Sequence, residues 1–422
     1  MNALVRPLRS LSGEITAPPS KANTHRALIA GLFSEGITEL VNPLQCDDTN
    51  ATATAITSLG AEVNREAHEW NVHSNGMLSA PQHVIDCGAS GVTLRFMIPI
   101  VSLTGQRVLL EANHSLIRRP LKPLQEALKQ LHTRVAIKSN SIIVEGQPDG
   151  GNVSIRGDVS SQFISGLLFA GSLMDNGLRL EVTTPLESRN YVTLTLGIME
   201  QHGIKIESNR EMTRMEIAPG QKYSASRHLI HGDFSSAAFT LAAAAATNSR
   251  VLVRDLQQSQ SEPDVILLQI LLKMGASIRF LKDGVIIEGG QLKGASIDIR
   301  DSPDLGPILA VLGCYAEGET RIIGARRLRY KESDRLATIT SELSALGANI
   351  TEAEDGLTIR GPCHLQGGVV QSHSDHRIAM ALSIAALGAS RDVIITDAEC
   401  VSKSYPKFFE DLRSLGVEVS EQ

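Results

Sequence analysis

The sequence is poor in aromatic residues and has no cysteine pair at a metal-binding spacing. Of its 422 residues, 4% are aromatic and one is Trp, so the chain offers little material for stacking on nucleic-acid bases. The net charge of −6 also argues against a phosphate-backbone partner, and we expect no nucleic acid. The five cysteines lie far apart without a CxxC spacing, which favours a reducing compartment over a zinc site.

Long hydrophobic runs are also missing. The most apolar stretch, Phe239–Thr247, is far shorter than the roughly 20 residues that a transmembrane helix needs. The opening residues, MNALVRPLRSLSGEI, contain no apolar segment of the signal-peptide type. We therefore expect a cytoplasmic protein with no membrane partner and, by default, a monomer.

Several common catalytic motifs are absent as well. The sequence has no GxxxxGK[ST], no GxGxxG after a strand, no HExxH and no GxSxG. Nucleoside-triphosphate, dinucleotide, zinc-protease and esterase functions therefore receive no motif support.

A short phrase recurs six times, each time between a helical pattern and an alternating strand pattern. It reads SLGAEV, QHGIKI, KMGASI, ALGANI and SLGVEV, with a degenerate copy QLHTRV. Glycine is common just past a helix end, where the chain turns left-handed. The pivots are spaced by 72, 71, 72, 72 and 69 residues: Gly60, His132, Gly203, Gly275, Gly347 and Gly416. This regularity predicts six units of strands and helices in two domains, because 422 residues exceed one ordinary core.

Each unit is also predicted to contain a second, more apolar helix. Runs such as SSQFISGLLFAGSL and DHRIAMALSIAALG follow small or acidic residues, which are good N-caps, and are apolar enough to be buried on most sides. β-Branched segments such as RVLLEA and GVIIEG predict strands. These helices are expected to begin near Ser20, Ser90, Ser160, Ser235, Asp304 and Asp375.

Charged residues interrupt the pattern at several of these helix starts. Helix N-termini attract phosphates and carboxylates, so grouped cations there indicate an anionic substrate. Examples are PPSKANTHRAL, CGASGVTLRF with Arg95, IRRPL, RYKESDRL and SDHRIAM. The alternatives are solvated surface arginines, an ordinary charged helix at KESDR, a structurally satisfied histidine in SDHR and a plain N-cap at SSQ.

Seven motifs occur in the order seen in enolpyruvyl transferases: PPSK with Arg26, RP at 119–120, SSQF, PD, KESDR, SDHR and the late Lys403. Over essentially the whole chain they resemble the 5-enolpyruvylshikimate-3-phosphate synthase family. The resemblance implies an α/β fold: a two-domain inside-out α/β barrel of six βαβαββ repeats, three per domain. One domain would span 21–230 and the other 1–20 plus 231–422, with the active site in the cleft between them.

The resemblance also implies a reaction, that of a 3-phosphoshikimate 1-carboxyvinyltransferase. The enolpyruvyl group of phosphoenolpyruvate would move to the 5-hydroxyl of shikimate 3-phosphate by addition and elimination, releasing phosphate. This step of the shikimate pathway leads to chorismate and the aromatic amino acids. No metal or cofactor is expected.

The resemblance assigns the site residues by role. Shikimate 3-phosphate would be bound by Lys21, Arg26, Ser160, Ser161, Gln162, Ser188, Tyr191, Asp304 and Lys331. Phosphoenolpyruvate would be bound by Lys21, Gly91, Arg119, Gln162, Arg335, Arg377 and Lys403. The catalytic candidates are Lys21, Asp304, Glu332, His376 and Lys403. Asp304, with Lys21 able to share the role, would take the hydroxyl proton, and Glu332 would protonate the methylene carbon.

Five positions depart from the commonest family pattern: Pro19, Ala22, Ala89, Val92 and Arg327. Ala22 offers no hydroxyl to the acceptor's carboxylate, so an enolpyruvyl transferase with another phosphorylated acceptor is the nearest alternative. The UDP-N-acetylglucosamine version carries a Cys in the loop that here reads EANHSLIRRP, which has none. A non-catalytic or RNA-end-processing protein with the same repeats is a more distant alternative.

Two of the repeats contain similar phrases, DVSSQF and DFSSAA. In the first phrase we interpret Ser160 and Ser161 as ligands built on a capping site. In the second we interpret Ser235 and Ser236 as mainly structural.

Overall fold

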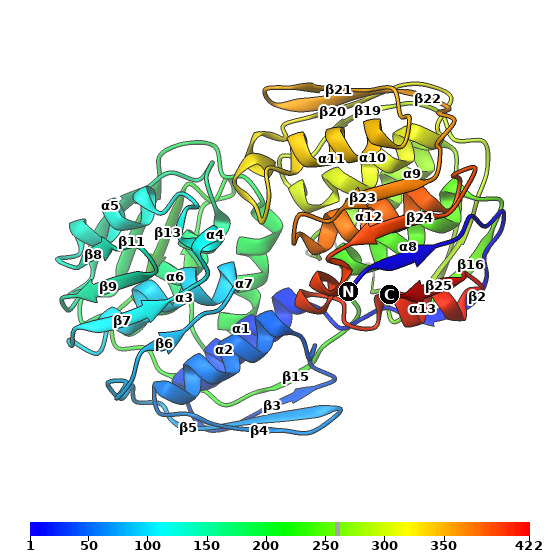
Figure 1. Ribbon diagram of the computed structural model, residues 1–422. Helices are drawn as coiled ribbons and strands as arrows, with labels where there is room; N and C mark the ends of the chain where they lie inside the picture. The colour runs from blue at the N-terminus through cyan, green and yellow to red at the C-terminus, as the bar shows by residue number, and fades with distance from the viewer. Residues whose placement is uncertain (258–261) are drawn as a thin grey trace. The chain divides into compact units, whose positions relative to one another are not determined.

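The chain forms two compact units in the computed structural model, which describes residues 1–257 and 262–422 (Figure 1). Unit 1 consists of Met1–Pro18 and His231–Gln422, and unit 2 of Pro19–Ile230. Each unit has its own hydrophobic core, as a chain of this length requires. None of the helices in the described ranges is long and apolar enough to cross a membrane.

Unit 2 contains three repeats of the same kind. The first has α1 (Lys21–Phe33), β3 (Ser34–Val41), α2 (Asp47–Ser58), β4 (Glu62–Arg65), β5 (Glu69–Asn75), β14 (Tyr223–Ser224) and β15 (Arg227–Leu229). The second has β6 (Ile85–Asp86), α3 (Gly91–Ser102), β7 (Val108–Glu111), α4 (His114–Ile117), α5 (Lys122–Gln130), β8 (Arg134–Ile137) and β9 (Ser141–Glu145). The third has β10 (Gly151–Ile155), α6 (Ser161–Gly171), β11 (Leu178–Val182), α7 (Arg189–Gln201), β12 (Ile206–Ser208) and β13 (Arg214–Ile217).

Unit 1 repeats the pattern three more times. One repeat has β2 (Ser12–Thr16), α8 (Phe234–Ala246), β16 (Arg250–Arg254), α9 (Ile266–Met274), β17 (Ser277–Leu281) and β18 (Gly284–Glu288). The next has β19 (Ser296–Asp298), the 3-10 turn η1 (Pro303–Leu305), α10 (Gly306–Tyr315), β20 (Gly318–Ile323), η2 (Arg326–Tyr330), α11 (Arg335–Ala345), β21 (Ile350–Ala353) and β22 (Gly356–Gly361). The last has β23 (Gly368–Gln371), α12 (His376–Ala386), β24 (Val393–Thr396), η3 (Ala398–Lys403), α13 (Phe408–Ser414), β25 (Val419–Glu421) and β1 (Ala3–Val5).

All six sheets share one topology. In the order β10-β11-β13-β12, for example, the first pair is parallel and the other two pairs are antiparallel. The parallel pair requires a crossover. In four repeats the more buried helix supplies it directly, as α6 does between β10 and β11, whereas the partners β2 and β16, and β3 and β15, are separated by long stretches of unit 2. The six units predicted from the sequence are therefore present as six βαβαββ sheets, three in each unit.

Two repeats of unit 1 are completed by the N-terminal segment. β2 pairs in parallel with β16, and β1 lies antiparallel between β24 and β25, so the first and last residues meet in one sheet. Figure 1 shows these blue strands among green and red ones, with the two termini close together. The chain thus begins inside unit 1, forms unit 2, and then returns.

The left-handed pivots predicted from the repeated phrase are confirmed. Their φ angles are +108° at Gly60, +59° at His132, +85° at Gly203, +106° at Gly275, +92° at Gly347 and +96° at Gly416. His132 adopts this conformation despite its Cβ, which is uncommon for a residue other than glycine.

All six predicted helix starts lie within two residues of the observed ones, and two of them differ in detail. α8 is capped by Asp233, whose carboxylate accepts a hydrogen bond from the Ser235 N–H at 2.9 Å, so Ser235 lies inside the first turn. Asp caps a helix as well as Ser does. The helix expected to start at Asp304 begins as the 3-10 turn η1, with Pro303 in its first turn, and α10 then follows from Gly306.

Helices α3 and α6 pack so closely that their backbones nearly touch. A Cβ added at Gly166 would lie 2.9 Å from the carbonyl oxygen of Arg95 and 3.0 Å from Pro99 Cγ. Arg95 is the fifth residue of α3, and Gly166 is the middle residue of α6. The crossing therefore fixes the first half of α3 against the middle of α6.

We predict that Gly166→Ala destabilises the protein by about 1–3 kcal/mol, because the added methyl group separates α3 from α6. Gly197→Ala is the matched control: Gly197 is also helical, in α7, and a Cβ there meets nothing within 4 Å. That control should be neutral or more stable by up to about 1 kcal/mol. Urea unfolding of both variants measures the difference, and equal stability of the two would contradict the close packing.

Candidate active site

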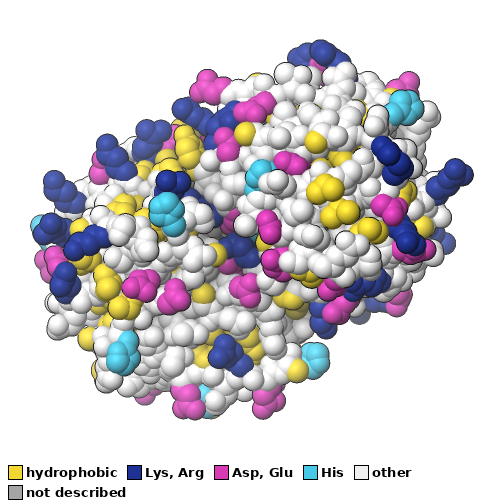
Figure 2. Space-filling model, viewed as in Figure 1, with side chains coloured by type: hydrophobic (Ala, Val, Ile, Leu, Met, Phe, Trp, Pro, Cys, Tyr) yellow, Lys and Arg dark blue, Asp and Glu magenta, His cyan; other side chains and the backbone are white. Residues whose placement is uncertain are grey.

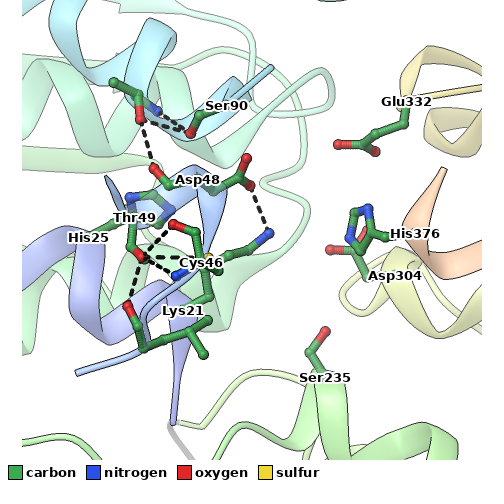
Figure 3. A network of polar contacts seen from close by, with 12 residues as sticks. Lys21, His25, Cys46, Asp48, Thr49, Ser90, Ser235, Asp304, Glu332 and His376 are labelled. Carbon is green, nitrogen blue, oxygen red and sulfur yellow. Dashed lines mark hydrogen bonds and ion pairs between the residues drawn. The ribbon is translucent and has the colours of Figure 1, made fainter. Parts of the chain in front are cut away.

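Lys21 begins α1 and is held by an ion pair in unit 2. Its Nζ lies 2.9 Å from Asp48 Oδ2, and Asp48, in the first turn of α2, is 5% exposed (Figure 3). A buried carboxylate is costly unless it is paired. Asp48 therefore restricts the position of the Lys21 ammonium.

Buried hydroxyl groups fix the helix starts around this pair. Thr49 accepts a hydrogen bond from the Cys46 N–H at 3.1 Å and so closes the first turn of α2. The Thr93 hydroxyl, in α3, lies 2.6 Å from the Thr52 hydroxyl and 2.7 Å from the Ser90 hydroxyl. These contacts connect the starts of α2 and α3.

A second group of side chains gathers where α3 and α6 begin. Arg95 donates a hydrogen bond to Gln162 Oε1 at 2.7 Å and lies over the Phe163 ring at 5.5 Å. A Cβ at Gly91 would come within 3.4 Å of Arg119 Nη1 and 3.6 Å of Arg95 Nη1. The structure thus brings together Gly91, Arg119 and Gln162, all predicted site residues, and adds Arg95.

Arg26 is almost fully buried and joins α1 to α7. It donates to Thr195 Oγ1 at 2.8 Å, to the Ala22 carbonyl at 2.9 Å and to the Tyr191 carbonyl at 3.0 Å. Its guanidinium lies over the ring of Tyr191 at 5.9 Å, and burial lowers the pKa of Arg26 to about 10. The family resemblance predicts that Arg26 binds a carboxylate. This role stays a prediction, because several N–H groups of Arg26 already donate hydrogen bonds within the protein.

The serines predicted to bind phosphate lie at the starts of α6 and α7. Ser160 and Ser161 are buried, and the Ser160 hydroxyl accepts from the Gln162 N–H at 3.3 Å, as an N-cap does. Ser188 precedes α7 in the left-handed conformation at φ +56°. All three lie in unit 2, as does Tyr191, whereas Lys331, predicted to bind the same phosphate, belongs to unit 1.

In unit 1, Arg335 is a buried cation shared by three carboxylates. It is 1% exposed and donates to Asp375 at 2.7 Å, to Glu332 at 2.7 Å and to Asp304 at 2.9 Å. Asp375, 0% exposed, also accepts the Ser333 hydroxyl at 3.0 Å and caps α12. Burial opposes the charge of Arg335, but these carboxylates outweigh it and raise the pKa of Arg335 above its usual value.

Asp304 is a carboxylate surrounded by three cations. Lys331 Nζ lies 2.9 Å from its Oδ1, and Arg377 Nη2 lies 3.5 Å from its Oδ2. Burial alone would raise the pKa of Asp304, but Arg377, Lys331 and Arg335 together hold it well below its usual range. Asp304 is therefore ionised at neutral pH.

Arg377 is positioned by Ser235. It donates to the Ser235 hydroxyl at 2.7 Å and to the Ser235 carbonyl at 3.3 Å. Ser235, interpreted from the sequence as mainly structural, therefore holds a predicted substrate-binding arginine. The sequence does not reveal this contact, because Arg377 lies 142 residues further along the chain than Ser235.

The remaining predicted residues of unit 1 surround this cluster. Burial lowers the pKa of Lys331, although Asp304 opposes the shift. His376 is buried in α12, with its Nδ1 3.8 Å from Asp375 Oδ1. Lys403, also buried, ends η3, which packs against α12. Figure 3 shows Asp304, Glu332 and His376, which come from three separate segments of the unit.

Asp264 is a buried acid that the sequence reasoning missed. It is 1% exposed, in the left-handed conformation at φ +61°, and interacts with Ser235 and Arg377. Burial, followed by the negative charge of Asp304, raises the pKa of Asp264 to about 6. Its only sequence signal was a single acid before an apolar helix.

Asp48, Arg95 and Asp375 were missed for a similar reason. The sequence shows Arg95 as an unexpected charge at a helix start and Asp375 as an N-cap, but it predicts no partner for either. Their roles depend on contacts with residues distant in the sequence.

Two of the residues that depart from the family pattern, Ala22 and Arg327, make hydrogen bonds within their own unit. The Ala22 carbonyl accepts a hydrogen bond from Arg26 at 2.9 Å. Arg327, in η2, donates to the Arg300 carbonyl. Both positions therefore contribute to the framework of their own unit.

Solved structures with a similar fold define the class of protein. EPSP synthase from Acinetobacter baumannii superposes with a TM-score of 0.82 at 26% sequence identity, covering 100% of both chains. The enolpyruvyl transferase NikO from Streptomyces tendae superposes with a TM-score of 0.81 at 17% identity, which shows a shared fold. The chain thus has the two-domain α/β fold of this class.

Sequence comparison then identifies the family. Residues 5–412 match the family described as EPSP synthase (3-phosphoshikimate 1-carboxyvinyltransferase), and the chain belongs to it. Relatives with the name 3-phosphoshikimate 1-carboxyvinyltransferase occur in Methanothermobacter thermautotrophicus (39% identity, 99% of both chains) and Clostridium perfringens (39%, 96% of both). A third, from Methanocaldococcus jannaschii, is 38% identical over 99% of this chain and 98% of the relative.

We predict that Asp48→Asn destabilises the protein by about 3 kcal/mol, the lower end of the range for breaking a buried pair, because Lys21 keeps some exposure. Asp47→Asn, at the exposed neighbour in the same first turn, removes an equal charge near the helix N-terminus and should cost no more than about 1 kcal/mol. Denaturant unfolding of both variants tests this. Equal losses would show that the Lys21 pair contributes nothing specific.

We predict that the free energy of unfolding of Asp264→Asn rises relative to that of the native protein as the pH rises, and we call this difference the gap. The raised folded-state pKa means that the contribution of Asp264 is fully present below about pH 4 and is lost as the pH rises through about 6. Asn does not ionise and tolerates a positive φ. The gap should therefore widen by up to about 3 kcal/mol between about pH 4 and pH 7.5.

Urea unfolding at the two pH values measures the gap. Asp175→Asn, at an exposed position in unit 2, controls for removing one carboxylate. A gap that is the same at both pH values would contradict a buried, proton-binding Asp264.

Proposed function

We propose that this protein transfers the enolpyruvyl group of phosphoenolpyruvate to the 5-hydroxyl of shikimate 3-phosphate, releasing phosphate. Membership of the EPSP synthase family over residues 5–412 supports this reaction. The structural observation that carries it is the Asp304 carboxylate, kept ionised by Lys331, Arg335 and Arg377. Anionic substrates that bind these cations weaken their hold on Asp304 and so raise its basicity, which allows the carboxylate to accept the hydroxyl proton.

The addition step needs a base and an acid. The 5-hydroxyl oxygen attacks C2 of phosphoenolpyruvate as its proton leaves, and the methylene carbon gains a proton, giving a tetrahedral intermediate. Asp304, with Lys21, is our candidate for the first role and Glu332 for the second. Glu332 accepts a hydrogen bond from Arg335, so it donates a proton to carbon only after first taking one up.

The elimination step reverses the proton transfer at carbon. The methyl group loses a proton to Glu332, the C2 double bond forms again, and the C–O bond to phosphate breaks. Cations near the departing phosphate stabilise the charge that develops there. We assign this task to Arg119, Arg377 and Lys403, with His376 assisting.

Each unit supplies one set of these groups. Unit 2 contains Lys21, Arg26, Arg119 and the Ser160–Gln162 turn, while unit 1 contains Asp304, Lys331–Arg335, Arg377 and Lys403. Both substrates carry a phosphate and a carboxylate, so the reaction requires several cations at once. We propose that the two sets act on the same pair of substrates. From the sequence we further expect a cytoplasmic monomer.

The Ala22 departure favours one alternative, a different phosphorylated acceptor. Phosphate release from phosphoenolpyruvate, measured with and without shikimate 3-phosphate, separates the two possibilities, and mass spectrometry identifies the product. Folded protein that is inactive with shikimate 3-phosphate but active with another acceptor would replace the proposed reaction.

We predict that Glu332→Gln lowers kcat by about 10²–10⁴-fold, because the amide donates no proton to carbon. Glu352→Gln is the matched control: Glu352 also binds an arginine, Arg329, at 2.7 Å in unit 1, but has no predicted catalytic role. The control should keep near-normal turnover. Near-normal turnover of Glu332→Gln would contradict its assignment as the acid.

A further inference from the structure

Cys314 and Cys363 lie next to each other at the far end of α10 from Asp304. Cys314 is in the last turn of α10 and is 1% exposed, whereas Cys363, just after β22, is partly exposed. The Cys363 N–H donates to the Cys314 carbonyl at 2.7 Å. Because the two backbones are hydrogen-bonded to each other at this point, the two side chains start from neighbouring positions, as a disulfide requires.

The chain around Gly361 keeps these two residues close. A Cβ at Gly361 would lie 2.5 Å from the carbonyl oxygens of both Gly313 and Ala316, so the backbone after β22 packs directly on the end of α10. On the other side of the helix end, the Tyr315 hydroxyl accepts a hydrogen bond from the Gly388 N–H at 2.8 Å. The backbone next to Cys363 is therefore held against the end of α10, where Cys314 lies.

The two thiols have opposite acid–base properties. The Cys363 sulfur accepts a hydrogen bond from the Asn349 N–H at 3.4 Å, and the Cys363 thiol donates one to the Arg360 carbonyl, also at 3.4 Å. The Cys314 thiol, with the backbone N–H and the nearby His364, lowers the pKa of Cys363 to about 6, although partial burial opposes the shift. The same thiol contact, together with burial, raises the pKa of Cys314. Cys363 is thus the nucleophilic thiolate at neutral pH, and Cys314 keeps its proton.

We propose that Cys314 and Cys363 form a reversible disulfide when the protein meets a hydroperoxide. The Cys363 thiolate attacks one peroxide oxygen: an S–O bond forms, the O–O bond breaks, and the alkoxide or hydroxide leaves and takes up a proton. Cys363 is oxidised by two electrons to a sulfenic acid while the peroxide is reduced. The Cys314 sulfur then attacks Cys363, the S–S bond forms, the S–O bond breaks, and water leaves with the Cys314 proton.

The other three cysteines do not share this arrangement. Cys46 and Cys87 are buried, and burial raises the pKa of both. Cys400 is partly buried, and burial raises its pKa to about 12. The oxidation should therefore be selective for one pair among the five cysteines.

The test uses the full-length protein treated with hydrogen peroxide, alkylated under denaturing conditions and digested. Mass spectrometry should find one cross-linked peptide pair joining Cys314 to Cys363, lighter by two hydrogen atoms and restored by a dithiol reductant. Alkylation of both thiols after peroxide treatment, or over-oxidation of Cys363 without a cross-link, would overturn the proposal.

Variants separate the two roles. With Cys314→Ser, the Cys363 sulfenic acid has no resolving thiol and should be trapped by a 1,3-diketone probe. Cys363→Ser should abolish both the cross-link and this labelling. Cys400→Ser is the matched control and should leave the cross-link unchanged, and loss of the cross-link in that variant would also count against the Cys314–Cys363 pair.

The thiolate assignment has its own readout in the untreated protein. The rate at which iodoacetamide labels Cys363 should rise with pH through about 6 and then level off. A rate that keeps rising to about pH 8.5, the ordinary thiol pKa, would overturn the assignment of Cys363 as the attacking group.

Discussion

The burial of one whole helix in every repeat is the constraint on which the structure depends. These helices, such as α8 and α12, have nearly every side chain buried, so the unpaired N–H groups at their starts must be satisfied within the protein. Ser20, Ser90, Ser160, Asp233 and Asp375 each accept a backbone N–H at one of these starts. The same helix ends carry partial positive charge, which favours anions. A structural requirement of the repeat thus creates the helix starts at which many of the predicted substrate-binding residues lie.

Charges brought to these buried places must be paired, and the pairs organise the site. Arg335 is the clearest example, because one guanidinium connects Asp304, Glu332 and Asp375 from separate segments. Asp48 holds Lys21 in an ion pair, and the Ser235 hydroxyl accepts a hydrogen bond from Arg377. At the surface, by contrast, basic and acidic side chains lie interspersed on the face shown in Figure 2. Ion pairs there contribute little to stability, so the buried pairs are the ones that position the predicted site residues.

Much of the fold was predictable because it rests on local chemistry that recurs. The pivot phrase predicted a left-handed residue at six places, including His132, and φ is positive at all six. The helix starts were less predictable: Asp233 and Ser235 both suit a helix start, and only the carboxylate contact shows which one caps α8. The contributions of β1 and β2 to unit 1 were also invisible in the repeat spacing, since these strands are separated from their partners by most of the chain.

The sequence by itself determined the number of repeats, the family and the residue types gathered at the helix starts. These depend on spacing and motif order, which are properties of the chain. Only the tertiary structure decided which charge meets which. Asp264 is an isolated acid in the sequence, and its raised pKa arises from burial and from its neighbour Asp304. Cys314 and Cys363 are likewise two unrelated cysteines until β22 returns to the end of α10. The physical reason is that desolvation and Coulomb energy depend on distance in space, which separation along the chain does not report.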